Sequence, residues 1–215
     1  MLWILLITTA LSRTLKMPAT VYIEDPPLKT NLSRVEVVDA LEKSAAEWEV
    51  LNSTVDFKIV DNRNAADVLV SWTMSSHLPQ GTWGYTTIWP NGSDDKAIDS
   101  SLVELRSDCD WKAVDALDLQ STLTHELGHA LGFHHSDVYE DTMYFSLIPG
   151  DLSKRSLTHR DRARVRHAYP RGLFGCGGIT RTALICEDLA CAEMLFDDDQ
   201  CYDDVFFDLL QPPAY

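Results

Sequence analysis

The stretch that decides the fold runs from His125 to His135 and reads HELGHALGFHH. It matches the pattern H-E-x-x-H-x-x-G-x-x-H at every fixed position. Residues four apart on a helix are neighbours, with Cβ atoms about 5–6 Å apart. His125 and His129 have this spacing, so a helix would direct both imidazoles at one tetrahedral Zn²⁺ ion.

Three further positions complete the pattern. Gly132 lets the chain turn out of the helix, because glycine adopts positive φ at little cost and often ends helices. His135 then supplies a third ligand. Glu126 is offset round the helix and can reach a metal-bound water, where a general base belongs. A lone histidine is usually only a hydrogen-bonded polar residue, but chance produces all five matches on the order of once in 10⁵ chains.

The motif resembles that of the metzincin zinc endopeptidases. Ser136 follows the third histidine, whereas astacin-like enzymes carry Glu there and adamalysin-like enzymes carry Asp. Met143, eight residues after His135, has the offset of the Met-turn in matrixins, the matrix metalloproteinase family. The resemblance to matrixins extends over roughly residues 18–170.

This resemblance implies an α+β fold of the metzincin type. The expected elements are a twisted, mostly parallel sheet with an antiparallel edge strand, an active-site helix and a C-terminal helix. It also implies one catalytic Zn²⁺ bound by His125, His129 and His135, with Glu126 as the catalytic residue. Met143 would place its thioether beneath the imidazoles, and His134 would be a rim residue.

The residue pattern predicts a compatible order of elements. Strands are predicted at residues 20–24, 55–59, 68–72, 81–90 and 97–106. A helix is predicted over residues 34–51, begun by a capping box of Ser33 and Glu36. Its expected buried stripe comprises Val35, Val38, Leu41, Ala45 and Trp48.

Two more helices are predicted in the second half of the chain. Asp115 or Asp118 can cap the active-site helix, and its expected buried residues are Leu119, Leu123 and Leu127. The last helix starts at Thr158, with Asp161 completing a capping box, and ends at Pro170. Its inward-facing residues are expected to be Val165, Ala168 and Tyr169.

The resemblance also places a substrate cleft. The strand at 81–90 would rim it and could take a peptide as an added strand; its Trp83 and Tyr85 are cleft candidates, with core or rim packing as the alternative. Tyr144, which matches the matrixin Met-Tyr pair and is not expected to bind metal, would begin the opposite wall. Phe145 and Leu147 follow where matrixins usually carry Pro-x-Tyr, so an apolar pocket of altered shape is expected.

Other metal sites have less support. Animal matrixins hold a structural zinc in a long loop before the edge strand, but this chain offers only His77 there, so a second zinc is not expected. Asp94, Asp95 and Asp99 could bind Ca²⁺, but solvation of an acidic loop is the favoured interpretation.

The composition excludes one class of partner. The 215 residues carry a net charge of −15, and nucleic-acid binding requires clustered Lys and Arg. Protein or peptide substrates and a monomer are expected instead. The apolar run at residues 1–11 is far shorter than the ~20 residues of a membrane span. It predicts a signal peptide over residues 1–12 and an extracellular protein, with a truncated gene start as the alternative because no Lys or Arg precedes the run.

Two segments are predicted to follow the signal peptide: a catalytic domain at 17–170 and an acidic appendage at 171–215. The appendage holds Cys176, Cys186, Cys191 and Cys201, which in an exported chain favour disulfides with three possible pairings. Cys109 is left over and could pair with the appendage or stay free.

The predicted function is that of a secreted zinc metalloendopeptidase that hydrolyses internal peptide bonds of proteins. One alternative is an astacin-like or other metzincin protease. Another, from a different class, is a catalytically silent, zinc-containing secreted binding module. Degenerate enzymes usually lose the Glu or a His first, and all of these residues are present, so the active protease is favoured.

Overall fold

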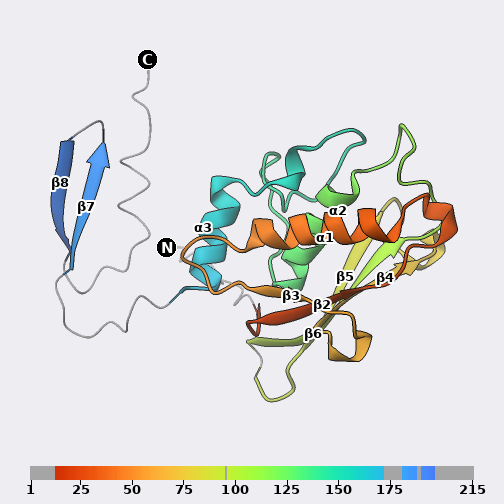
Figure 1. Ribbon diagram of the computed structural model, residues 1–215, viewed down its shortest axis with the longest axis horizontal. Helices are drawn as coiled ribbons and strands as arrows, with labels where there is room; N and C mark the ends of the chain where they lie inside the picture. The colour runs from red at the N-terminus through yellow and green to blue at the C-terminus, as the bar shows by residue number, and fades with distance from the viewer. Residues whose placement is uncertain (1–12, 95, 172–180, 188–189, 197–215) are drawn as a thin grey trace, which may run out of the picture. The chain divides into compact units, whose positions relative to one another are not determined.

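The structure is a computed structural model that describes residues 13–94, 96–171, 181–187 and 190–196 (Figure 1). The chain divides into two compact units, Met1–Arg171 and Gly172–Tyr215. The predicted signal peptide at residues 1–12 lies outside the described residues.

One sheet of six strands organises the first unit. The strands are β1 (Thr14–Leu15), β2 (Ala19–Ile23), β3 (Phe57–Ile59), β4 (Val68–Thr73), β5 (Gly84–Pro90) and β6 (Ala97–Arg106). Their hydrogen-bonded order is β1-β6-β4-β2-β3, with β5 also paired to β6. Every pairing is parallel except β5 with β6. The expected mostly parallel sheet with an antiparallel edge strand is confirmed.

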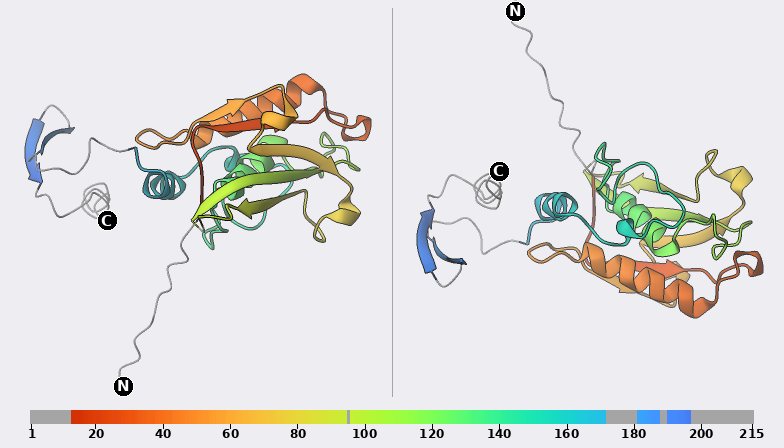
Figure 2. Two further views of the ribbon diagram at one scale, coloured as in Figure 1. Left: turned by 90° about the horizontal axis from the view of Figure 1, so that it is seen from below. Right: turned by 90° about the horizontal axis from the view of Figure 1, so that it is seen from above.

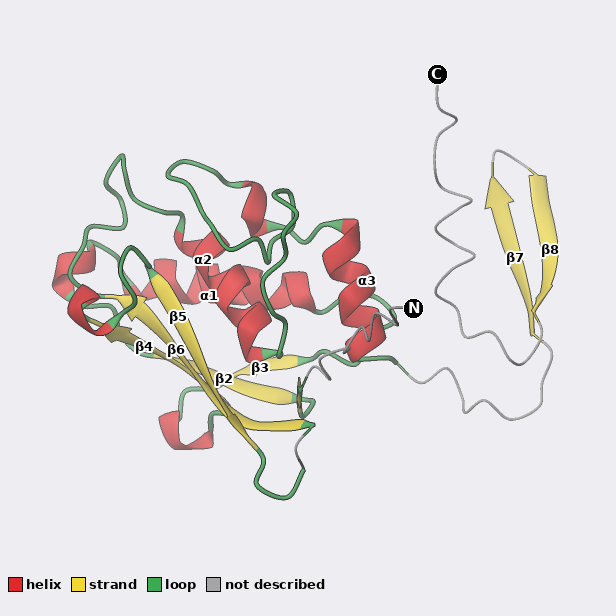
Figure 3. Ribbon diagram, turned by 180° about the vertical axis from the view of Figure 1, so that it is seen from behind, coloured by secondary structure: helices red, strands yellow, loops and turns green. Residues whose placement is uncertain are grey.

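The described residues of the same unit form three α-helices. They are α1 (Arg34–Trp48), α2 (Leu119–Ala130) and α3 (His159–Ala168). Short 3₁₀ turns occur at Leu28–Thr30, Arg63–Ala65, Ser75–His77 and Ser153–Arg155. Figures 1 and 3 show α1 and α2 together on one face of the sheet, and Figure 2 gives the same layering from below and above. Both predicted capping boxes, at the starts of α1 and α3, are present.

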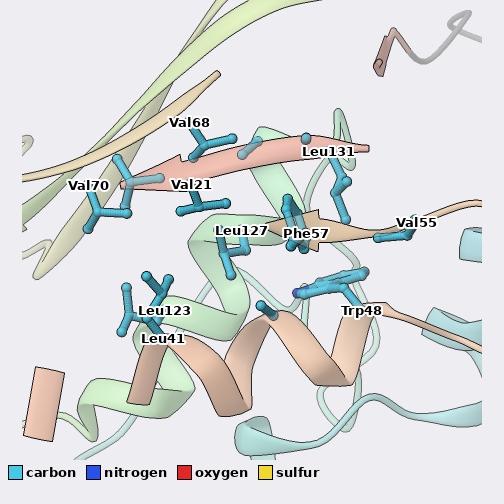
Figure 4. Close-up of a cluster of buried hydrophobic side chains, with 14 of the residues drawn as sticks. Val21, Leu41, Trp48, Val55, Phe57, Val68, Val70, Leu123, Leu127 and Leu131 are labelled. Carbon is cyan, nitrogen blue, oxygen red and sulfur yellow. The ribbon is translucent and has the colours of Figure 1, made fainter. Parts of the chain in front are cut away.

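The core lies between the two long helices and the sheet (Figure 4). Leu41 of α1 and Leu123 and Leu127 of α2 are fully buried there. The indole N–H of Trp48 donates to the carbonyl of Thr124 at 2.8 Å and so ties α1 to α2. Each fully buried aliphatic side chain contributes about 1.5–3 kcal/mol, so this layer sets where α2 sits and which of its faces turns away from the core.

The predicted register of α1 is partly wrong. Val35 is 77% exposed, although it was placed in the buried stripe. The buried side chains are Val37, Ala40, Leu41, Ser44, Ala45 and Trp48. Valines at 35, 37 and 38 offer competing stripes, and small residues such as Ser44 fit where the helix lies close to α2. The helix also ends at Trp48 rather than at Leu51.

Two further differences concern the sheet. The predicted strand at 81–90 begins only at Gly84, because Gly81 has φ +83° and Thr82 N–H bonds back to the Pro79 carbonyl at 3.1 Å. The two-residue strand β1 was not predicted. It lies before the expected start of the domain at residue 17 and pairs with the first residues of β6.

The second unit contains a hairpin of β7 (Arg181–Glu187) and β8 (Ala190–Phe196), paired antiparallel. Cys176 and Cys201 lie outside the described residues, so the disulfide pairing stays a prediction. In the described part of the chain, Cys109 is a free, half-buried thiol whose pKa is raised to about 11 by burial. Within the described residues, none of the helices combines the length and apolar character that a bilayer crossing requires.

Candidate metal centre

The direction of α2 is fixed at its first turn by Asp118. Its carboxylate accepts the N–H of Ser121 at 2.8 Å, so Asp118, rather than Asp115, is the N-cap. The guanidinium of Arg155 holds the same carboxylate with two hydrogen bonds, of 2.9 and 2.6 Å. Leu119, Leu123 and Leu127 are buried as expected. The helix is therefore anchored before its histidines are reached.

The imidazoles of His125, His129 and His135 converge. The Nε2 atom of His129 lies 3.1 Å from Nε2 of His125 and 3.1 Å from Nε2 of His135. The candidate ligand atoms of the three residues all lie within 4.8 Å of one another. Ligands at about 2.0–2.1 Å from a tetrahedral Zn²⁺ are ~3.4 Å apart. The separations therefore fit one such ion.

Hydrogen bonds decide which nitrogens face the centre. Nδ1 of His125 lies 2.8 Å from the Thr142 carbonyl, and Nδ1 of His129 lies 2.7 Å from the Phe133 carbonyl. A carbonyl only accepts, so both Nδ1 atoms carry the proton and each Nε2 presents its lone pair. Carbonyls that accept from the far ring nitrogen in this way orient histidine ligands.

The charge state of the three rings also favours metal binding. Burial lowers the pKa of His125 to about 4 and that of His129 to about 3, so both rings are neutral at pH 7. Burial also lowers the pKa of His135. Two neutral rings whose lone pairs face each other at 3.1 Å cannot hydrogen-bond to each other. A cation satisfies both, and this donor set suits Zn²⁺.

Gly132 makes the turn that brings the third histidine into place. Its φ is +93°, in the left-handed region that favours glycine. A Cβ here would lie 1.9 Å from the carbonyl oxygen of Arg13. The chain thus leaves α2 close against the N-terminal segment before it reaches His135. His134, beside it, is exposed and lines the cavity rim.

Met143 is buried against the middle of α2. Only 1% of it is exposed, and its sulfur would lie 2.3 Å from a Cβ at Gly128, the residue before His129. The N–H of Ser136 donates to the Met143 carbonyl at 2.7 Å, which joins the residue after the third histidine to this turn. The close contact requires glycine at position 128.

Glu126 points from α2 toward strand β5. It is 6% exposed, and the hydroxyl of Thr86 donates to its Oε2 at 2.6 Å. Burial raises the pKa of Glu126 to about 7, and the hydrogen bond from Thr86 opposes that rise. A carboxylate whose pKa lies near neutrality is suited to accept and return a proton.

A cavity of about 610 Å³ opens over the histidines and Glu126. Tyr85 lines it from β5, and Trp83 lines it from the turn before that strand. Phe145 and Leu147 line it from the loop after Met143. The sequence suggested these four residues for a substrate cleft, and all four line this cavity. Tyr144 is not among the lining residues, because its ring packs against Tyr139 and Phe145, with centroids 5.3 and 4.4 Å apart.

Two buried charged groups hold the loop between His135 and α3. Asp161 Oδ2 accepts the N–H of Thr142 at 2.8 Å, and the carbonyl of Thr142 is the partner of His125. Lys154 is 1% exposed; its ammonium donates to the Tyr139 carbonyl and lies over the Tyr139 ring, 4.8 Å from the centroid. Asp161, the N3 residue of the α3 capping box, is thereby linked through Thr142 to the first histidine.

Asp141 is the most enclosed carboxylate of this loop, with a side chain that is 0% exposed. It accepts hydrogen bonds from Ser136 at 2.6 Å, Thr158 at 3.0 Å and Arg160 at 3.0 Å. Burial alone would raise its pKa, but these hydrogen bonds outweigh burial and lower it. Asp141 therefore stabilises the folded state as an anion.

We expect Asp141→Asn to lower the free energy of unfolding at pH 7 by about 1–3 kcal/mol, the range for hydrogen bonds to a buried charged group. A carboxyl whose pKa is lowered by folding stabilises the folded state fully at pH values above its unfolded pKa, near 3.9. This stabilisation is lost as the pH falls through the folded pKa. The gap between variant and wild type, measured by urea unfolding, should shrink from pH 7 to pH 3. A gap independent of pH would contradict the role of the charge.

Sequence reasoning found the three histidines, Glu126 and Met143 but missed the residues that hold them. Thr86 and Asp161 contact Glu126 and Thr142 from β5 and α3. Asp161 was identified only as a helix cap. Because side chains alternate along a strand, the sequence predicts that Thr86 and Gly84 lie on one face of β5. It does not predict which helix packs against that face.

The fold and the histidine cluster are those of the metzincin class. The chain belongs to the matrixin family, whose sequence model matches residues 19–170. The astacin-like alternative is thereby set aside. Family membership implies zinc, and the cluster of His125, His129 and His135 can hold it.

Three plant proteins from Arabidopsis thaliana are similar. Metalloendoproteinase 5-MMP is 40% identical over 162 residues, which cover 66% of this chain and 42% of that protein. Metalloendoproteinase 1-MMP is 29% identical over 171 residues, covering 76% and 43%. Metalloendoproteinase 2-MMP is 25% identical over 143 residues, covering 62% and 37%. The chain thus spans about two fifths of the length of these relatives.

Proposed function

We propose that this protein is a secreted zinc-dependent endopeptidase that hydrolyses internal peptide bonds of proteins. The observation that carries the proposal is the convergence of three imidazole Nε2 atoms beside the buried carboxylate of Glu126, in a cavity flanked by strand β5. His125, His129 and His135 would hold the zinc. When bound, zinc supplies a Lewis acid that polarises a carbonyl and lowers the pKa of a bound water toward ~7.

The chain's own residues perform the proton transfers. Glu126 accepts a proton from the attacking water and passes it to the leaving amine, so that its carboxylate is regenerated. Its burial, with 6% of the residue exposed, keeps bulk water from competing for that proton. Met143, which packs against Gly128, would form the floor of the site beneath the imidazoles.

The substrate would be held chiefly through its backbone. Strand β5 pairs with β6, and a peptide can add to its other edge as a further strand. Trp83 and Tyr85 would flank the peptide there, while Phe145 and Leu147 would contact the side chain that follows the cleaved bond. Internal peptide bonds fit this mode of binding, because the substrate peptide can extend along β5 on both sides of the cleaved bond.

Several further assignments are part of the proposal. Residues 17–170 would form the catalytic domain and residues 171–215 an acidic appendage. The apolar run at residues 1–11 supports export, and the protein would act as a monomer on protein substrates outside the cell. A catalytically silent zinc module is the rival, because the same three histidines would bind the metal in either case.

Metal removal separates the two functions. Dialysis of the purified chain against a chelator should abolish cleavage of an internally quenched peptide, because the histidines then have no ion to hold. Stoichiometric Zn²⁺ should restore it. The silent module would rebind zinc without cleaving any peptide in a diverse library. Cleavage that continues after measured zinc loss would contradict the zinc-dependent mechanism.

A further inference from the structure

We propose that Thr86 is a positioning residue that locks the carboxylate of Glu126 onto strand β5 and leaves Oε1 as the oxygen that exchanges the proton. This inference rests on the proposed function, in which Glu126 is the general base. It concerns a contact between residues 40 positions apart in the chain.

The first observation is the contact made by the hydroxyl of Thr86. Its Oγ1 lies 2.6 Å from Glu126 Oε2 and 3.1 Å from the main-chain carbonyl oxygen of the same residue. Both oxygens can only accept and the hydroxyl has one hydrogen, so the shorter distance indicates that it donates to Oε2. Hydrogen bonds to an ionised acceptor are shorter and stronger than neutral ones, so this bond favours one orientation of the side chain.

The second observation is the space at Gly84, two residues earlier on the same face of β5. A Cβ at this position would lie 2.8 Å from Glu126 Oε1, 2.9 Å from its Cγ and 2.9 Å from Thr122 Cγ2. The Glu126 side chain therefore lies directly on the strand backbone. It lies between the hydroxyl of Thr86 and the backbone of Gly84, which has no side chain to displace it.

These two contacts assign different tasks to the two carboxylate oxygens. Oε2 accepts from Thr86, so proton uptake at Oε2 would weaken the hydrogen bond that orients the group. Oε1 is in the space that Gly84 leaves open. The carboxylate can thus take up a proton at Oε1 and release it while its orientation is kept.

The contacts also place the base and the peptide on one element. β5 pairs with β6 from Gly84 to Pro90, in an unbroken register up to Trp89. A peptide added to β5 and a carboxylate hydrogen-bonded to β5 would share one reference element and so keep a constant spacing. Misplacement of a catalytic group by about 1 Å can cost about 10²-fold in rate, so a fixed spacing matters for turnover more than for binding.

The test uses three variants of the full, zinc-loaded chain. Thr86→Val keeps the shape but removes the donor, Thr86→Ser keeps the donor, and Thr87→Val makes the same chemical change on the opposite face of the strand. Thr86→Val should retain its zinc and its KM but lose about 10²-fold in kcat. Thr86→Ser should recover most of that loss, and Thr87→Val should match the wild type. A Thr86→Val enzyme with wild-type kcat would overturn the proposal.

A stability measurement tests the same contact without activity. Thr86→Val should lower the urea midpoint of the zinc-loaded chain, and this shift should largely disappear when Glu126 is already Ala, since a double-mutant cycle isolates the pairwise interaction. An equal shift in both backgrounds would show that Thr86 acts through general packing and would overturn the inference.

The two proposals fail in different ways. If the wild type cleaves no peptide, or if Glu126→Ala stays active, the proposed function fails. If the wild type is active, Glu126→Ala is inactive and Thr86→Val behaves like Thr87→Val, only the positioning role is wrong.

Discussion

Replacing Glu126 with glutamine is expected to lower kcat by about 10³-fold, within the 10²–10⁴ range of general acid–base catalysis, while zinc content stays at the wild-type level. Glutamine keeps the shape and can still accept the hydrogen bond of Thr86, but it cannot take a proton from water. The residue is only 6% exposed, so a carboxylate ion from the buffer cannot readily take its place as the base. Metal analysis beside a quenched-peptide assay measures both quantities.

His134→Gln is a suitable control for this change, because it alters another polar residue of the cavity rim outside the three-histidine cluster. It should keep its zinc and lose far less activity than Glu126→Gln. Substantial turnover by Glu126→Gln with full zinc content would mean that another group moves the proton.

Gly132→Ala is expected to have the second largest effect, a loss of zinc affinity together with a lower melting temperature. The left-handed φ of +93° costs a non-glycine residue about 1–2 kcal/mol. The new Cβ would also meet the Arg13 carbonyl oxygen at 1.9 Å, so backbone must move. Arg13 precedes β1, which is tied to β6 and to the Tyr169 hydroxyl. The turn that presents His135 would therefore be displaced.

Gly150→Ala provides a matched control. Gly150 also has a left-handed φ, of +77°, but a Cβ there would meet nothing within 4 Å. It should show the backbone cost alone and keep full zinc affinity, as measured by competition with a coloured chelator. Equal zinc affinity in the two variants would contradict the role given to the Gly132 turn.

The elements that the sequence predicted well are those with a local signal. The histidine spacing on α2, the glycine turn and the capping boxes each depend on residues within a few positions of one another. Val35 was misplaced because three valines within four residues give the helix competing apolar stripes. Strand β1 has only two residues and no period to detect, and it is held by contacts with Ala97 and Tyr169 far along the chain.

The same distinction applies to the candidate site. The motif identifies the groups that would bind metal and move protons, because their spacing is set by helix geometry. Their partners come from other elements: Thr86 from β5, Thr142 from the loop and Asp161 from α3. A single sequence carries no record of such pairings. The close approach of Gly84 to Glu126 likewise becomes visible only when the helix is packed on the sheet.

X-ray absorption at the zinc edge of the purified chain, compared with the His135→Ala variant, tests the three-histidine centre most directly. A zinc ion bound by the three histidines should show only nitrogen and oxygen neighbours at about 2.0–2.1 Å, with an imidazole signal that weakens in the variant. Sulfur neighbours at about 2.3 Å would place the ion on cysteines. That result, or a spectrum unchanged by His135→Ala, would contradict the three-histidine centre.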